Sequence, residues 1–233
     1  AVLAMVQVPT FDPNTPGTIP STLRRNRIVS DIHEPGSTLK ALFAAAALDS
    51  NVVKPDEKIY CERGRYRIGR RTIHDHHPYE WLSFAEVIKH SSNIGVAKVA
   101  ERLGQDTYYR YLRAFGLGQT TGIDLPAESR GLLPQAKKWP RITLATTSFG
   151  HGVAVTPLQL ASVFATLAND GFLMRPYVVQ EIRNTAGEIV KTNSPQHVWQ
   201  AVQADAAGVE ARVEMNPVLL KPEAEHISQV VVM

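Results

Sequence analysis

The chain has 233 residues, of which 44% are hydrophobic and 20% charged, and its formal net charge is +3. This length and apolar content suffice to bury a substantial core. The single cysteine, Cys61, excludes an internal disulfide, and no apolar run reaches the roughly 18 residues of a membrane-spanning helix. The basic residues are dispersed except for a cluster at Arg63, Arg65, Arg67, Arg70 and Arg71. Arginines on a hairpin are more often solvated than bound to nucleic acid, so we expect no nucleic-acid partner.

Apolar periodicity and turn residues predict a mixture of helices and strands. We expect strands over residues 1–9, 174–182 and 188–191, and helices over residues 36–50, 84–103, 106–115 and 157–168. Thr156 before Pro157 is a favourable helix start. Gly187 predicts a hairpin between the last two strands.

Ser37 and Lys40 form an S-x-x-K motif at the start of the first predicted helix. Residues three apart share a helix face, so Lys40 should lie beside the Ser37 hydroxyl. A nucleophile, an amine and the positive end of a helix dipole outline a serine acyl-transfer site. To act as a base, Lys40 needs a pKa lowered by roughly 3 units. The alternative is that Ser37 only caps a helix and Lys40 is solvated.

Ser91 and Asn93 form an S-x-N triplet some fifty residues further along. S-x-x-K followed by such a triplet is typical of β-lactamases and penicillin-binding proteins. Further stretches support the comparison: Phe11-Asp12-Pro13-Asn14, Asn26-Arg27, the Glu34–Lys40 stretch, Ile73-His74-Asp75 and Val155-Thr156-Pro157-Leu158-Gln159-Leu160. Over about residues 1–195 the chain resembles the transpeptidase domain of class B, cell-division-type penicillin-binding proteins.

The resemblance implies an α+β fold, in which an antiparallel sheet is flanked by helices and the site lies between the sheet and a helical subdomain. It implies peptidoglycan D,D-transpeptidase activity on stem peptides, with trapping of β-lactams at the same serine. Ser37 would be the nucleophile and supply one oxyanion N–H, Lys40 the base, Ser91 a proton relay and Asn93 a ligand of the substrate amide. No cofactor or metal is implied. Relatives work with cell-division membrane proteins and are anchored in the inner membrane, with this domain on the periplasmic side, whereas this chain shows no signal or transmembrane segment.

The family's third motif, K-T-G, is missing from the sequence. In the family its strand supplies the second oxyanion N–H and a cationic clamp for the substrate carboxylate. Lys191-Thr192-Asn193 ends in Asn and follows the predicted hairpin turn too early in the chain, so we interpret it as a chance similarity. We therefore expect impaired activity, with the family's C-terminal strands absent and a sheet edge and apolar face exposed.

Residues 196–233 differ in character from the rest of the chain. Residues 200–210, 213–222 and 228–232 resemble a fragment of cobyric acid synthase, without its phosphate loop or its glutaminase cysteine. We interpret residues 1–195 as a partial transpeptidase domain and residues 196–233 as a foreign tail, as in a chimera. The alternative is that these residues are a divergent transpeptidase tail.

Three functional hypotheses follow. The first is an impaired D,D-transpeptidase, the second a non-catalytic penicillin-binding-protein fragment, and the third, resting on the tail alone, a glutamine amidotransferase fragment related to cobyric acid synthase. His74-Asp75-His76-His77 offers zinc-binding groups. Adjacent residues cannot all converge on one ion and Pro78 keeps the segment extended, so no metal site is expected here.

Overall fold

In the computed structural model, residues 1–212 and 229–232 are described, apart from 13, 16 and 18. The helices are α1 (Ser21–Arg24), α2 (Arg27–Ser30), α3 (Lys40–Asp49), α4 (Phe84–Lys89), α5 (Asn93–Leu103), α6 (Gln105–Ala114), α7 (Arg141–Ser148), α8 (Pro157–Ala168) and α9 (Ala204–Arg212), with 3₁₀ turns η2 (Gly36–Leu39), η3 (Glu62–Gly64) and η4 (Ala136–Lys138). The strands are β1 (Ala4–Gln7), β2 (Lys58–Tyr60), β3 (Arg65–Ile68), β4 (Arg71–His74), β5 (Trp81–Ser83), β6 (Phe172–Met174), β7 (Glu181–Arg183), β8 (Ile189–Thr192), β9 (His197–Gln200) and β10 (Gln229–Val232).

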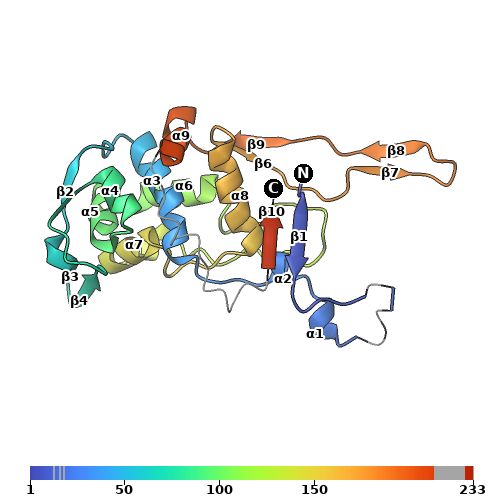
Figure 1. The fold of residues 1–233 in the computed structure, drawn as a ribbon, viewed down its shortest axis with the longest axis horizontal. Helices are drawn as coiled ribbons and strands as arrows, with labels where there is room; N and C mark the ends of the chain where they lie inside the picture. The colour runs from blue at the N-terminus through green and yellow to red at the C-terminus, as the bar shows by residue number, and fades with distance from the viewer. Residues whose placement is uncertain (13, 16, 18, 213–228, 233) are drawn as a thin grey trace.

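Helix α3 lies among the other helices of the helical body (Figure 1). Every residue from Lys40 to Ala47 is buried, and five of these eight are alanine. A helix that is buried all round needs small side chains, because neighbouring helices must approach it from several directions. Helices α4, α5, α6, α8 and α9 all contact it. The start of α3 is therefore held rigidly by the core.

The predicted helix over residues 84–103 is wrong in one respect, because it is two helices. A capping box between Ser83 and Glu86 starts α4, and Ser92 caps the start of α5 by accepting from the N–H of Gly95. Between them, Ser91 takes a left-handed backbone conformation with φ 55°, which interrupts a right-handed helix. The break lies in the S-x-N triplet itself.

The strands form antiparallel pairs at both ends of the helical body, so the expected α+β class is confirmed (Figure 1). The pairs are β1 with β10, β2 with β5, β3 with β4, β6 with β9 and β7 with β8. The hairpin around Gly187 is confirmed as β7–β8, which projects from the body. Met174 does not belong to it, because β6 pairs with β9. The expected absence of C-terminal strands needs correction, because β10 pairs with β1 from Ala4↔Val232 to Gln7↔Gln229.

Residues 197–208 pack against the preceding part of the chain. Ala201 and Val202 are buried, and the N–H of Gln203 donates to Asp49 Oδ1 at the end of α3, 2.8 Å away. Helix α9 contacts α3 and α8. Packing is thus continuous across residue 195, while the assignment of residues 196–233 to a foreign tail stays a prediction. Much of that resemblance, residues 213–222 and 228, lies outside the described residues.

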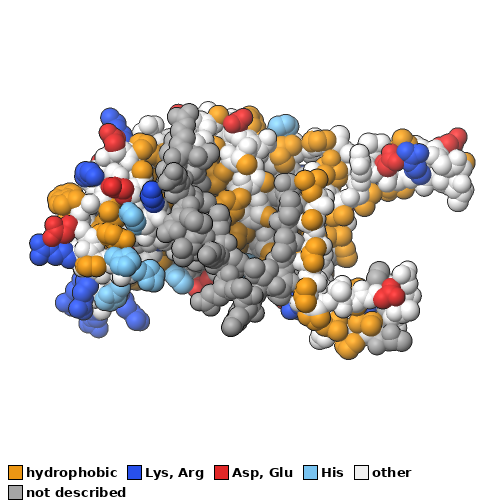
Figure 2. Space-filling view, in the orientation of Figure 1, with side chains coloured by type: hydrophobic (Ala, Val, Ile, Leu, Met, Phe, Trp, Pro, Cys, Tyr) orange, Lys and Arg blue, Asp and Glu red, His pale blue; other side chains and the backbone are white. Residues whose placement is uncertain are grey.

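Apolar side chains remain exposed along β1 and the β7–β8 hairpin (Figure 2). Leu3, Val6 and Val8 flank or belong to β1, and Leu3 is 74% exposed. Basic side chains gather at the opposite end, around β3 and β4. Among the helices of the described ranges, none is long and apolar enough to cross a membrane.

Candidate active site

The segment before α3 is fixed by a close approach of two glycines. The N–H of Gly36 donates to the carbonyl of Gly150, 3.1 Å away. A Cβ atom on Gly150 would lie 2.0 Å from the Gly36 carbonyl oxygen, so only glycine allows this contact. Ser37 follows directly in η2 and is half-buried.

Lys40 is buried in the first turn of α3, with 1% of its surface exposed. Its ammonium donates to three acceptors: the Ser91 carbonyl at 2.7 Å, Ser91 Oγ at 2.8 Å and Asn93 Oδ1 at 2.7 Å. Burial lowers the pKa of Lys40 to about 7, although the negative charge of Asp75 acts in the opposite direction. The shift brings the amine into the range in which it exchanges protons near neutral pH. The predicted lowering is thus present, and burial is its main cause.

Ser91 connects Lys40 to Ser37. Its hydroxyl donates to Ser37 Oγ at 3.1 Å while it accepts from Lys40 Nζ. We expected Lys40 to lie directly beside the Ser37 hydroxyl. In the structure, the hydrogen bonds that connect the two residues run through Ser91, which is more than fifty positions away in the chain. The left-handed conformation of Ser91 turns both its carbonyl and its hydroxyl toward the amine.

Asn93 has a fixed orientation in this network. Its Oδ1 accepts from Lys40, and its Nδ2 donates to the carbonyl of His74 at 3.1 Å. One further acceptor position and one further N–H remain on the amide. The structure therefore brings together all four residues predicted from the sequence: Ser37, Lys40, Ser91 and Asn93.

Asp75 holds the S-x-N loop in place through two hydrogen bonds. It accepts from Ser92 Oγ at 2.5 Å and from the N–H of Ile94 at 3.1 Å. Among the described residues, no group of three or more His, Cys, Asp or Glu could hold a metal ion. Asp75 positions the loop, a role that the motif spacing did not indicate.

Glu34 and His151 form a second contact that sequence reasoning did not single out. The Glu34 carboxylate accepts from the N–H of Gly152 and lies 2.8 Å from His151 Nδ1. The pKa of Glu34 is lowered, first by the Gly152 hydrogen bond and then by His151. Glu34 stands next to Pro35 in the nucleophile segment, but its partner is 117 residues away. A short-range motif carries no signal for such a pair.

Lys191-Thr192, the partial match to the third motif, lies on β8 with exposed side chains. The hairpin that carries it projects away from the helical body (Figure 1). Its position agrees with the interpretation that the similarity arose by chance.

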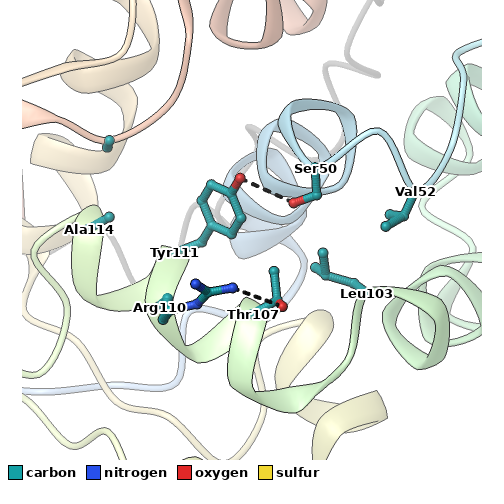
Figure 3. A pocket seen from close by; sticks show the side chains of 8 residues that line it. Ser50, Val52, Leu103, Thr107, Arg110, Tyr111 and Ala114 are labelled. Atoms are coloured by element: carbon teal, nitrogen blue, oxygen red, sulfur yellow. Dashed lines mark hydrogen bonds between the residues drawn. The ribbon is translucent and has the colours of Figure 1, made fainter.

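The cavity of about 430 Å³ at the other end of α3 contains none of the four predicted residues. Ser50, Thr107, Arg110 and Tyr111 contribute its polar groups, and Tyr111 and Ser50 point toward each other across it (Figure 3). Tyr111 also donates to Asp49 Oδ2 at 2.5 Å. These groups satisfy each other and present no free nucleophile.

The sequence matches the family profile described as "Penicillin binding protein transpeptidase domain" over residues 1–210. A peptidoglycan D,D-transpeptidase FtsI of Escherichia coli is 40% identical over 185 residues, which is 78% of this chain and 30% of the relative. A probable peptidoglycan D,D-transpeptidase PenA of Neisseria flavescens is 33% identical over 218 residues, 91% of this chain and 54% of the relative. The chain thus spans about half or less of the curated relatives that it matches.

Solved structures agree in fold. Penicillin-binding protein 3 of Mycobacterium tuberculosis, complexed with aztreonam, superposes with a TM-score of 0.79 at 28% identity, covering 97% of this chain and 52% of that one. The transpeptidase domain of Burkholderia pseudomallei penicillin-binding protein 3 gives a TM-score of 0.70 at 30% identity, covering 79% and 53%.

Proposed function

Because the chain belongs to the penicillin-binding protein transpeptidase domain family, we propose that it performs serine acyl transfer on peptidoglycan stem peptides, with Ser37 as the nucleophile. The observation that supports this most strongly is the hydrogen-bonded series from Ser37 through Ser91 to the buried amine of Lys40. A capping serine beside a solvated lysine would need none of these contacts. β-Lactams would be ligands of the same serine.

In the acylation step, Ser37 Oγ attacks the carbonyl carbon of the penultimate D-Ala. The Ser37 proton passes to Ser91 Oγ as the Ser91 proton passes to neutral Lys40. The bond to the terminal D-Ala then breaks, and its amine takes a proton back through Ser91. Neutral Lys40 has two N–H donors and one lone pair, so one of its three present contacts reverses direction. The contact with Ser91 Oγ is the one that can reverse, because a hydroxyl both donates and accepts.

The negative charge on the substrate oxygen needs two donors. The backbone N–H of Ser37 would be one, since the N–H of Gly36 is already bonded to Gly150. The 233 residues contain no K-T-G triplet to supply the second. Loss of one such donor typically costs about 10²–10³ in rate, so we propose that a polypeptide of these residues alone acylates slowly.

Intact-mass measurement after prolonged incubation with benzylpenicillin tests the proposal. We expect one adduct per chain, absent from Ser37→Ala. An adduct that persists in Ser37→Ala would contradict the nucleophile assignment, and a folded chain that never forms the adduct would support the non-catalytic alternative. Appending a C-terminal segment that contains K-T-G should accelerate labelling, and an unchanged rate would contradict the proposed impairment.

A further inference from the structure

A second cavity, of about 370 Å³, opens from the candidate active site. Asn93 and Phe149 line it at the site end, and β4 lines it as far as Arg71. Ile142 and Thr146 of α7 form part of its wall. Asn93 thus belongs both to the Lys40 network and to this cavity. A substrate held at Asn93 can extend into it.

The cavity runs along the edge of a strand. All four residues of β4, from Arg71 to His74, line it, although successive side chains in a strand point to opposite faces. β4 pairs with β3 on one side, and among the described residues no strand pairs with its other edge. The free edge of a strand offers backbone donors and acceptors that an extended peptide can use.

The charge of the cavity favours a carboxylate. The Arg71 side chain is exposed and has no ion-pair or hydrogen-bond partner within the described part of the chain, although its backbone pairs with Ile68 of β3. By contrast, Arg141 at the start of α7 is bound by both oxygens of Glu101, and Arg63 pairs with Glu80. The described lining includes no Asp or Glu. One unneutralised guanidinium, which binds carboxylates in a bidentate manner, therefore stands at the far end.

The position of Arg71 on β4 also sets its distance from Asn93 along the cavity. Asn93 Nδ2 is bonded to the His74 carbonyl, so the site end of the cavity is level with His74. Arg71 lies three residues back along β4. At about 3.3 Å per residue, this places the two ends of the cavity about 10 Å apart. An extended peptide with an amide at Asn93 would present its carboxylate about three residues away.

We propose that this cavity, defined by β4 and α7, binds an extended acidic segment of a stem peptide, with Arg71 pairing with one of its carboxylates. The proposal rests on the function proposed above and names a specificity-determining residue for it. Arg71 would contribute to peptide binding without touching the reacting atoms.

Peptide binding to the Ser37→Ala chain tests this role. A stem pentapeptide ending in D-Ala-D-Ala is titrated in two forms, one with free carboxylates upstream of that end and one with these amidated. Arg71→Glu should weaken binding of the free form by roughly tenfold or more, as expected for a charged hydrogen-bonded pair, and leave the amidated form unchanged. Arg70→Glu is the matched control, because it makes the same charge change in the turn before β4 and Arg70 does not line the cavity.

Equal weakening by Arg70→Glu and Arg71→Glu would overturn the proposal, because it would indicate only a general charge effect. Equal effects on the free and amidated peptides would also overturn it. Arg71→Gln provides a second variant should Arg71→Glu unfold, and it should leave binding of the amidated form unchanged but lose the preference for the free form. Arg71→Lys should recover part of that preference.

Two further arms identify the source of the carboxylate and separate this proposal from the previous one. If the effect of Arg71 on binding requires the D-Ala-D-Ala end, the acidic segment belongs to the stem peptide that acylates Ser37. If a shortened peptide without that end shows the same effect, the segment belongs to the stem peptide that supplies the amine. Either result supports the proposal. Penicillin labelling of the Arg70→Glu control with Ser37 intact should match the parent chain. Absence of labelling in both the parent chain and this variant would contradict the proposed function. The peptide-binding experiment would still test the role of Arg71 independently.

Discussion

The two ends of α3 carry similar polar groups in different arrangements. At its start, the amine of Lys40 is buried among neutral acceptors, Ser91 and Asn93, and its pKa falls to about 7. At its end, the hydroxyl of Tyr111 donates to the Asp49 carboxylate, and burial is the largest cause of a raised Tyr111 pKa. The first arrangement makes a base available near neutral pH, and the second holds a weak acid protonated. The pKa directions therefore favour the Ser37 end of α3 for the proposed chemistry, even though the larger of the two cavities lies at the other end.

Substitution of Lys40 should produce the largest difference between the two ends. Lys40→Arg keeps the positive charge, but guanidinium stays protonated in proteins and cannot accept the Ser37 proton. We expect the rate of penicillin adduct formation to fall by roughly 10³-fold or more, within the range for loss of a general base. Intact-mass time courses measure it.

Ser50→Ala is the control for that experiment, because Ser50 lines the cavity at the other end of α3. Its rate should stay within about twofold of the parent. If Lys40→Arg acylates as fast as the parent chain, Lys40 acts only through its charge, and the distinction drawn between the two ends fails.

The pH dependence of acylation should be the next largest effect. Lys40 with a pKa of about 7 is mostly protonated below that pH, so the rate should fall about tenfold per unit from pH 7 to pH 5 and level off above pH 8. Asp75 lies near enough to raise the Lys40 pKa. Asp75→Asn should therefore move the midpoint to lower pH. A midpoint that does not move would contradict the electrostatic part of this account.

Stability should change with pH in the opposite sense to that of a lysine in a salt bridge. The folded chain binds the Lys40 proton less tightly, with a pKa of about 7 against 10.5 in the unfolded chain. The free energy of unfolding should therefore rise between about pH 7 and pH 10 as the cost of burying the charge disappears, by at most roughly 4 kcal/mol. The difference between the parent and Lys40→Met isolates this contribution in urea unfolding. A difference that is constant over this range would show that the pKa is not lowered.

The glycine contact behind Ser37 should give a smaller effect on rate together with a clear loss of stability. Gly150→Ala adds a Cβ that meets the Gly36 backbone at 2.0 Å, and Gly150 has φ 86°. Gly152→Ala is a matched control, since Gly152 has φ 82° but its Cβ would meet only Thr147 Oγ1 at 3.9 Å. Both variants should lose about 1–2 kcal/mol from backbone strain. Only Gly150→Ala should lose more than this and also acylate about tenfold more slowly, as measured by urea unfolding and adduct formation.

The residues predicted from the sequence are those whose signals are local. Ser37 and Lys40 share one helical turn, and Thr156 with Pro157 starts α8 as predicted. The approach of Ser91 to Ser37 is not local, because it depends on α4 and α5 packing closely at Gly95, where a Cβ would lie 2.5 Å from Val87. Periodicity alone predicted one continuous helix there.

Contacts between residues far apart in the chain were not predicted, because they leave no local signal in the sequence. Glu34 and His151 are 117 residues apart, and the Gln203 contact with Asp49 spans 154. Such contacts follow from how elements pack, whereas propensity and capping describe each element alone. The sequence therefore predicted the four residues that cluster at the start of α3 better than the groups that position them.

Tyr111→Phe should have the smallest effect and should act on stability alone. It removes the hydroxyl that donates to Asp49 while Asp49 keeps its bond from the Gln203 N–H. Loss of a partly buried hydrogen bond to a charged group costs about 1–2 kcal/mol, which corresponds to a fall in Tm of a few degrees for a chain of this length. The penicillin adduct rate should stay unchanged, because the change lies at the opposite end of α3 from Ser37. A rate that falls in proportion to stability would mean that the two ends are coupled through the buried helix, and hydrogen exchange along α3 would then show faster opening at Lys40 as well as at Asp49.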